Sequence, residues 1–244
     1  MAQASGAQLS WVDGQGFRHR VFSQVKDPQP RLLRVYLGGD GRAFLTPTTV
    51  ASDPTPQEHL GLSLMLADPG NTLYLARPCY YQAAMDANCQ ASLWTSLRYG
   101  ETVLASMEQA LATVSGQYPT AEIHLVGYSG GGVLALQLAR RSARISQVVT
   151  VAAPLDTDAW TRHHHYTALP AGHNPARVAR WPASLKQVHL AGAADSQVPP
   201  ALNQRFQAQL ADSGAAARFY VLAGFDHRCC WVQQWPELLQ DYAL

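Results

Sequence analysis

Short apolar runs alternate with amphipathic segments along most of this chain. In residues 101–115, apolar side chains return every three or four positions, which predicts a helix with one buried face. Short runs rich in Val, Leu and Ile separate such segments, as is typical of buried strands. Strands are predicted at residues 17–25, 31–37, 72–76, 122–126, 147–151, 187–190 and 218–222. Further helices are predicted at residues 131–141, 201–211 and 231–242.

This alternation predicts an α/β fold. Right-handed strand–helix–strand crossovers give a mostly parallel central sheet with helices on both faces. Residues 155–181 interrupt the pattern, because they are rich in His, Trp and Pro and much longer than the usual αβ loop of about 2–6 residues. We expect a single domain over residues 1–244, with a lid or binding insertion at about 155–181.

Composition narrows the class of partner. The chain has 244 residues, of which 47% are hydrophobic and 14% charged, with 18 Lys and Arg against 17 Asp and Glu. Nucleic-acid binding needs a clustered basic excess, which this balance does not provide. No apolar run approaches the length of about 20 residues that a membrane-spanning helix requires. The sequence therefore predicts no transmembrane segment, and a small partner without strong charge.

The N-terminus and the cysteines bear on the compartment. Residues 1–6 have neither the basic nor the apolar stretch of a signal peptide. The protein is expected in the periplasm or outside the cell if an upstream signal was removed, and otherwise in the cytoplasm. Cys79 and Cys89 bracket a short segment that could close as a disulfide in an oxidising compartment. The adjacent Cys229 and Cys230 are expected to be small buried packing residues.

The stretch with the clearest chemistry is Gly-Tyr-Ser-Gly-Gly at residues 127–131. A predicted strand runs directly into this Gly-x-Ser-x-Gly pattern, and a predicted helix follows it, which is the context of a nucleophile elbow. In such an elbow Ser129 lies on a tight turn that exposes its hydroxyl. Gly127 and Gly131 let the strand and the helix approach. The N–H groups at the start of the helix favour an oxyanion there.

This context resembles the α/β-hydrolase fold family of serine esterases and lipases. The family keeps its triad in the order Ser, acid, His, and two later positions fit that order. Asp195 follows a predicted strand and a Gly turn and precedes Val-Pro, like the family's acid loop. His227 lies just beyond the last predicted strand, where the family has its base. The resemblance implies that His227 activates Ser129 and that Asp195 orients His227.

Two other carboxylates are rivals for the acid. Asp226 is adjacent to His227 in sequence, and neighbouring side chains seldom meet in hydrogen-bonding geometry. Asp156 follows the strand after the elbow, a position that some family members use. We prefer Asp195 to both.

Gly-Gly-Asp-Gly at residues 38–41 resembles the oxyanion loop that lipases and esterases carry after the third strand. The family's second donor is the N–H of the residue after the nucleophile. The predicted backbone donors are therefore Asp40 and Gly130, with Gly39 as the alternate. The side chain of Asp40 could alternatively cap the following turn.

Substrate contacts are expected from residues near the predicted strand ends, namely Tyr80, Tyr128, Trp160 and His164. The His run at 163–165 invites a metal, but consecutive histidines point in different directions and no carboxylate lies at ligand spacing. We expect no metal. No organic cofactor is expected either, because the glycines after Val126 lack dinucleotide-binding spacing.

Residues 77–81, 94–99 and 156–164 look similar to segments of uncharacterised bacterial α/β-hydrolases, many of them exported or lipid-anchored. That resemblance covers most of the chain and names no substrate. The lipobox cysteine of those relatives is missing, so an anchor cannot be carried over.

The preferred prediction is a carboxylesterase that cleaves small to medium acyl esters through a Ser-His-Asp triad and an acyl-enzyme. A thioesterase, a lipase or a peptidase with the same triad is the first alternative. A non-catalytic binding member of the fold is the second. The oligomeric state stays open.

Overall fold

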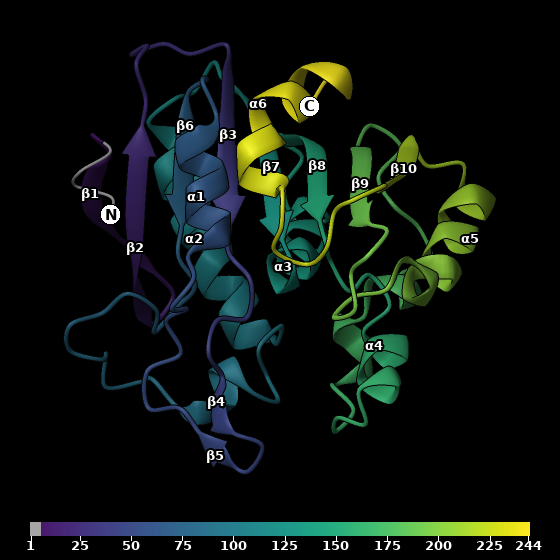
Figure 1. The fold of residues 1–244 in the computed structure, drawn as a ribbon. Helices are drawn as coiled ribbons and strands as arrows, with labels where there is room; N and C mark the ends of the chain where they lie inside the picture. The colour runs from purple at the N-terminus through teal and green to yellow at the C-terminus, as the bar shows by residue number, and fades with distance from the viewer. Residues whose placement is uncertain (1–5) are drawn as a thin grey trace.

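In the computed structural model, which describes residues 6–244, a mixed sheet forms the centre of the molecule (Figure 1). Its strand order is β1-β2-β6-β3-β7-β8-β9-β10. The strands are β1 Gln8–Gly14, β2 Phe17–Gln24, β3 Leu32–Leu37, β6 Thr72–Leu75, β7 Glu122–Tyr128, β8 Ile145–Val151, β9 Lys186–Gly192 and β10 Ala217–Leu222. A separate hairpin consists of β4 Phe44–Thr46 and β5 Thr49–Val50. The polar start at residues 1–5, considered above for a signal peptide, lies outside the described residues.

Neighbouring strands from β6 to β10 in this order are parallel, and β1 and β2 join the edge antiparallel. The predicted α/β class with a mostly parallel sheet is confirmed. The C-terminal ends of β3, β7 and β8 meet at one edge, and the β4–β5 hairpin and α4 lie beyond that edge (Figure 1). Open parallel sheets hold their functional sites at this edge.

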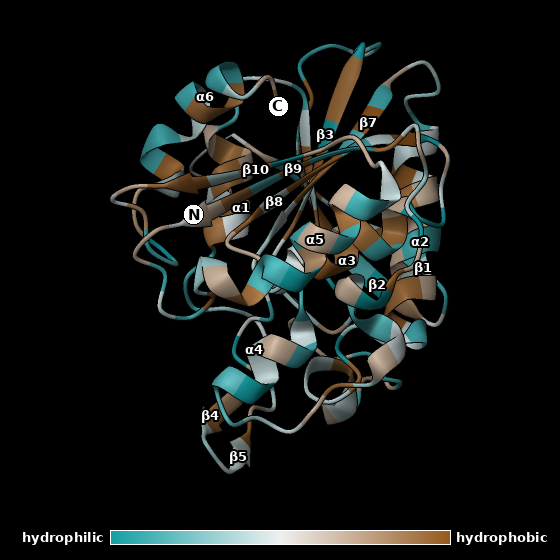
Figure 2. Cartoon of the chain, turned by 90° about the vertical axis from the view of Figure 1, so that its right-hand side faces the viewer, coloured by the Kyte–Doolittle hydropathy of each residue, from teal (hydrophilic) through white to brown (hydrophobic). Residues whose placement is uncertain are grey.

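Helices cover both faces of the sheet, with α1 and α6 on one side and α2, α3 and α5 on the other (Figure 2). Their bounds are α1 Leu60–Ala67, α2 Glu101–Gly116, α3 Gly130–Ala139, α4 Thr157–His163, α5 Gln204–Ser213 and α6 Trp231–Asp241. Short 3₁₀ turns are η2 Ala91–Trp94, η3 Ala171–His173, η4 Pro175–Arg177 and η5 Pro200–Asn203.

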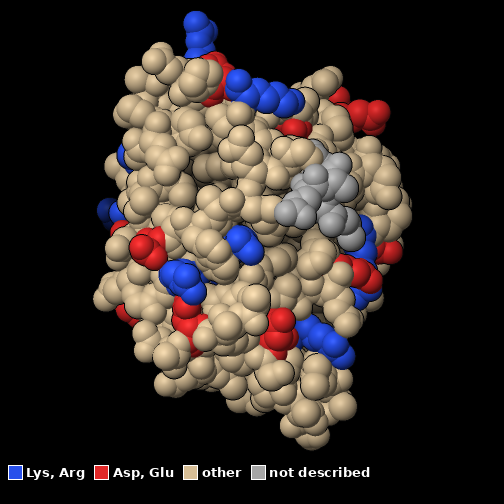
Figure 3. All heavy atoms as spheres, turned by 90° about the vertical axis from the view of Figure 1, so that its left-hand side faces the viewer, with Lys and Arg blue, Asp and Glu red and all other residues tan. Residues whose placement is uncertain are grey.

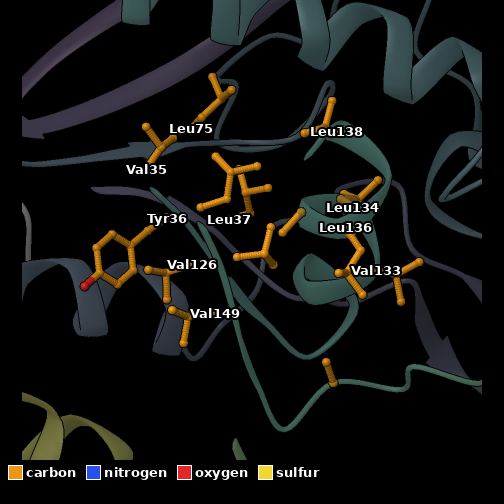
Figure 4. Close-up of a cluster of buried hydrophobic side chains, with 14 of the residues drawn as sticks. Val35, Tyr36, Leu37, Leu75, Val126, Val133, Leu134, Leu136, Leu138 and Val149 are labelled. Carbon is orange, nitrogen blue, oxygen red and sulfur yellow. The ribbon is translucent and has the colours of Figure 1, made fainter. Parts of the chain in front are cut away.

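The core between these layers is mostly apolar. Val35 and Leu37 of β3 belong to the same buried cluster as Leu134 and Leu138 of α3 (Figure 4), and all four are at most 1% exposed. Every residue of α3 is buried, so the helix that follows the predicted elbow is fixed within the core. A close-packed setting of this kind keeps a neighbouring turn in one conformation.

The face at the N-terminal edge of the sheet carries few charged side chains (Figure 3). In the face that β1 and β2 present (Figure 3), Lys, Arg, Asp and Glu are scattered and neither sign forms a continuous patch. This agrees with the balance of 18 basic and 17 acidic residues. No helix of the described residues is long and apolar enough to cross a membrane.

The four cysteines form two disulfides, and the second of them was not predicted. Cys79 is bonded to Cys89, the pairing that their spacing suggested. Cys229 and Cys230 are not free packing residues, since they are bonded to each other. Cys229 is exposed and Cys230 partly exposed, because they lie in the surface loop between His227 and α6 and not in the core.

Residues 155–181, expected as a lid or binding insertion, contain α4, η3 and η4. Asp156 caps α4 by accepting hydrogen bonds from the N–H groups of residues 158 and 159. Asp158 is paired with Arg177 at 2.7 Å, and Asn174 donates to Asp156 at 2.8 Å. Contacts between its own residues thus stabilise the segment. Its role as a lid stays a prediction.

Candidate active site

Ser129 lies on the turn between β7 and α3, with φ of 51° and ψ of −127°. A positive φ is unusual for any residue other than glycine, and it persists only where the surroundings enforce it. The N–H of Ser129 donates to the carbonyl of Val151 at 2.8 Å, and its carbonyl accepts from Gly132 at 2.9 Å. Strand β8 on one side and α3 on the other therefore hold the serine in this strained conformation.

Two glycines make the turn sterically possible. A Cβ at Gly127 would overlap the carbonyl of Gly131, where β7 meets the start of α3. A Cβ at Gly131 would overlap the carbonyl of Leu37 at the end of β3. The structure thus gives the predicted reason for both glycines.

Replacing Gly127 by alanine is expected to lower the free energy of unfolding by about 3 kcal/mol, because backbone on both sides of the overlap is buried and cannot move aside. Urea unfolding followed by circular dichroism measures it. Gly116→Ala is the matched control, since a Cβ there meets nothing within 4 Å at the end of α2. Equal unfolding free energies for the two variants would contradict this explanation of the elbow.

Asp195 and His227 meet beyond the ends of β9 and β10. Asp195 Oδ2 accepts a hydrogen bond from His227 Nδ1 at 2.8 Å. Asp195 Oδ1 accepts from the N–H groups of Gln197 and Val198, both at 2.8 Å. The Asp195 side chain is fully buried, whereas that of His227 is 17% exposed. The carboxylate is therefore fixed, and it selects the tautomer of His227 that carries its proton on Nδ1.

Tyr128 connects the serine turn to the histidine loop. Its ring centroid lies 5.4 Å from that of His227, and its hydroxyl donates to the carbonyl of His227 at 3.0 Å. Burial first, and then the negative charge of Asp195, raise the pKa of the Tyr128 phenol, which therefore stays a neutral donor. The residue before Ser129 thus touches His227 directly, although the two are far apart in sequence.

The rival carboxylates have other partners. Asp226 is on the surface and accepts from the N–H groups of Arg228 and Cys229, which closes the turn after His227. Those hydrogen bonds lower the pKa of its carboxyl. Asp156 is buried and caps α4. These contacts favour Asp195 as the partner of His227.

The glycine-rich segment after β3 lies against the serine. A Cβ at Gly39 would come within 3.2 Å of the Ser129 Cβ, and a Cβ at Gly130 would overlap the carboxylate of Asp40. The predicted donor positions Gly39, Asp40 and Gly130 are therefore brought together beside Ser129. That their N–H groups donate to an oxyanion stays a prediction.

The side chain of Asp40 does not cap its own turn, the alternative considered above. Its Oδ1 accepts from Arg77 at 2.8 Å, and its Oδ2 accepts from Arg98 at 3.0 Å and from the Tyr99 hydroxyl at 2.7 Å. Burial alone would raise the pKa of the Asp40 carboxyl, but the two guanidinium charges and the Tyr99 hydrogen bond outweigh it and hold this pKa low. Asp40 is thus held as a carboxylate by three donors, with its side chain 18% exposed.

The residues expected to contact substrate occupy different places. Tyr80 is 3% exposed, and its hydroxyl donates to the carbonyl of Asp40 at 2.7 Å. It therefore helps to fix the segment at residues 38–41. Trp160 Nε1 and His164 Nε2 both point at the carbonyl of Gln197, at 3.1 and 2.7 Å. They tie α4 to the loop that carries Asp195. Substrate contact by these residues stays a prediction.

Two other pairs have catalytic residue types but no access. His19 Nε2 lies 2.7 Å from the Ser106 hydroxyl, and both residues are 0% exposed. His189 Nδ1 lies 2.8 Å from the Thr150 hydroxyl, and burial lowers the pKa of His189 to about 3. A substrate reaches neither pair, because each is enclosed in the core.

The sequence analysis did not identify Arg77, Arg98 and Tyr99 as partners of Asp40. They fall in segments that resembled a bacterial subfamily, which was the available signal. Only the folded chain shows that all three converge on Asp40.

Neither a protein-family model nor a curated protein matches the sequence. Solved structures do match. A serine hydrolase homologue from Coxiella burnetii has a TM-score of 0.62 at 14% identity, covering 96% of this chain and 94% of that one. An esterase from Pyrococcus furiosus has a TM-score of 0.66 at 14% identity, covering 100% and 91%. A puromycin-hydrolysing peptidase from Mycobacterium tuberculosis has a TM-score of 0.68 at 14% identity, covering 96% and 38%.

Proposed function

We propose that this chain, which has the α/β-hydrolase fold, is a serine hydrolase that cleaves small to medium acyl esters. The observation that carries the proposal is the part-buried Asp195–His227 hydrogen bond of 2.8 Å, near the turn that carries the partly exposed Ser129. Tyr128 supports it further, because it contacts His227 while preceding the serine. The nearly equal numbers of acidic and basic residues favour an uncharged ester.

In the proposed reaction, Ser129 Oγ attacks the ester carbonyl carbon while its proton passes to His227 Nε2. The carbonyl electron pair moves onto oxygen, and the N–H groups of Asp40 and Gly130, or Gly39, stabilise that oxyanion. His227 then gives its proton to the departing alcohol as the C–O bond breaks. Water hydrolyses the acyl-enzyme by the same steps, which releases the acid and restores Ser129.

Asp195 holds His227 in the tautomer with Nε2 free to accept the proton, and its charge stabilises the imidazolium that forms. Because Gln197 and Val198 fix the second carboxylate oxygen, Asp195 keeps its orientation as the proton moves. The contribution expected from one oxyanion donor is about 3–4 kcal/mol of barrier.

The test is a substrate panel with the purified full chain. p-Nitrophenyl esters from acetate to decanoate are compared with an acyl thioester, a triglyceride and a chromogenic peptide. The proposal expects the highest kcat/KM on an ester of short or medium chain. Higher kcat/KM on the thioester, the triglyceride or the peptide would replace the ester assignment with one of those activities. No turnover of any of them would favour a binding protein.

A further inference from the structure

A largely buried ionic cluster is built around Asp40 of the predicted oxyanion loop. The Asp40 cluster consists of Asp40, Arg77, Arg98 and Tyr99. Each oxygen of the Asp40 carboxylate is bound by an arginine, at 2.8 and 3.0 Å, and Tyr99 adds a third donor at 2.7 Å. The side chains of Arg77, Arg98 and Asp40 are 3%, 13% and 18% exposed, so the cluster is largely but not fully buried. Solvent therefore screens these charges much less than it screens a surface pair.

The cluster includes one predicted donor, Asp40, and contacts the other, Gly130. The arginines bind the Asp40 carboxylate, and the hydroxyl of Tyr80, outside the cluster, donates to the Asp40 backbone carbonyl. Both the side chain and the backbone of Asp40 are therefore fixed. At Gly130, a Cβ would overlap the Asp40 carboxylate and lie 2.6 Å from the Tyr99 hydroxyl. The cluster thus packs against the start of α3 as well as against the loop.

Its charge has a sign that suits an oxyanion. One carboxylate beside a developing negative charge would repel it, but two guanidinium groups leave the cluster with a net charge of +1. Arg77 is held although its Nε and Nη1 are buried without a hydrogen-bond partner, and its guanidinium lies 5.5 Å from the Tyr99 ring centroid. Burying a cation with incomplete hydrogen bonding lowers the stability of the fold, so stability alone does not explain the buried position of Arg77.

We infer that Arg77, Arg98 and Tyr99 are positioning residues for the oxyanion hole. They act through Asp40, which they orient so that its N–H and that of Gly130 converge on one point, and their net positive charge favours the oxyanion over the neutral ester. This inference rests on the proposed serine-hydrolase function. It assigns to the cluster a role in the transition state and not in binding the ground state.

Arg98 gives the sharpest test, because at 13% exposed it is the less buried arginine, and among the described residues its guanidinium donates, besides Asp40, only to the carbonyl of Thr95, at 2.6 Å. Arg98→Gln removes the charge, whereas Arg98→Lys keeps it within reach. For Arg98→Gln we expect kcat on the best ester to fall at least about tenfold with KM little changed, a smaller loss than for a direct donor. Arg98→Lys should recover most of that loss.

The affinity for a boronic acid is a second measurement, and it should not change if the cluster only stabilises the fold. Ser129 Oγ bonds to boron, its proton passes to His227, and the tetrahedral boron becomes anionic, as the intermediate does. The affinity of Arg98→Gln for phenylboronic acid should fall in parallel with kcat. Tyr99→Phe, which removes only one hydroxyl, should show the same pattern to a smaller extent. Urea unfolding verifies that each variant is folded.

Arg141→Gln is the matched control, because Arg141 also pairs with carboxylates, those of Glu101 and Glu108, but on the helix surface. It should leave kcat and boronate affinity unchanged. Wild-type kcat and boronate affinity in a folded Arg98→Gln protein, a rise in KM alone, or an equal loss in the Lys and Gln variants would each overturn the inference. A parent protein without esterase activity or boronate binding would instead refute the proposed function.

Discussion

Replacing Ser129 by alanine is expected to lower kcat for ester hydrolysis by about 10⁶-fold, the loss typical of removing a triad nucleophile. The reason is that no acyl-enzyme forms without the hydroxyl. KM for the ester should change little, because the hydroxyl adds little to binding of the intact substrate. Stopped assays with p-nitrophenyl butyrate measure both quantities. Alanine at this position should keep the elbow, since the backbone N–H and carbonyl of Ser129 hold the turn and its hydroxyl makes no hydrogen bond within the described residues.

Ser106→Ala is the matched control for that variant. Ser106 is also hydrogen-bonded to a histidine, His19, but both lie in the core. Its loss leaves a buried ring nitrogen without a partner, which should cost about 1–3 kcal/mol of stability and no activity of the folded enzyme. If Ser129→Ala retained activity while Ser106→Ala lost it, the nucleophile assignment would be wrong.

Asp195→Asn is expected to lower kcat by about 10⁴-fold with the fold intact. The amide loses the charge that stabilises the imidazolium. It also presents an NH₂ group to the two backbone donors or to His227, so that His227 is no longer held in the tautomer with a free Nε2. Measuring kcat against pH, together with thermal unfolding, separates this effect from simple destabilisation.

The same substitution at the rival positions provides the control. Asp226→Asn should leave kcat close to that of the parent, because its carboxylate closes an exposed turn. Asp156→Asn should affect the stability of α4 more than kcat, since Asp156 caps that helix. A loss of about 10⁴-fold at either position, with activity kept in Asp195→Asn, would move the acid role to that residue.

The elements that the sequence predicted well are those with a clear period or a short apolar run. Strand β7 and helix α3 were predicted to within a few residues, because an apolar run, a glycine-rich turn and a second apolar run follow one another there. Helix α1 was missed. Its sequence, Leu-Gly-Leu-Ser-Leu-Met-Leu-Ala, is apolar on most sides and shows no helical period. Strand β1 was missed because it is a largely exposed edge strand.

Asp195 and His227 were predicted from the resemblance to the α/β-hydrolase family, because they follow predicted strands in the family's order of Ser, acid and His. Parallel strands present their C-terminal ends at one edge, and the structure brings the two residues into contact there. The partners of Asp40 could not be predicted. Arg77 and Arg98 are 37 and 58 positions away in sequence, and no local pattern pairs an arginine with a carboxylate at such a distance.

For the adjacent cysteines, the prediction from the sequence was wrong. Cys229 and Cys230 were expected in the core from composition alone, since small apolar residues are usually buried. They instead lie in the loop that leads from His227 into α6, where a positive φ at Cys230 turns the chain into the helix. Burial of a short loop residue depends on tertiary packing, which one sequence does not reveal.

The central claim, an activated serine at the elbow, is tested most directly by covalent labelling with a fluorophosphonate, which reports the nucleophile without knowledge of the substrate. After reaction, the fluoride leaves and the phosphonyl group stays on the serine oxygen. Tryptic digestion then gives a peptide covering residues 99–140, which contains Ser129 and also Ser106 and Ser115. We expect stoichiometric labelling that fragment spectra place on Ser129, and none in Ser129→Ala. Labelling placed on another serine, or no labelling of the folded parent, would contradict it.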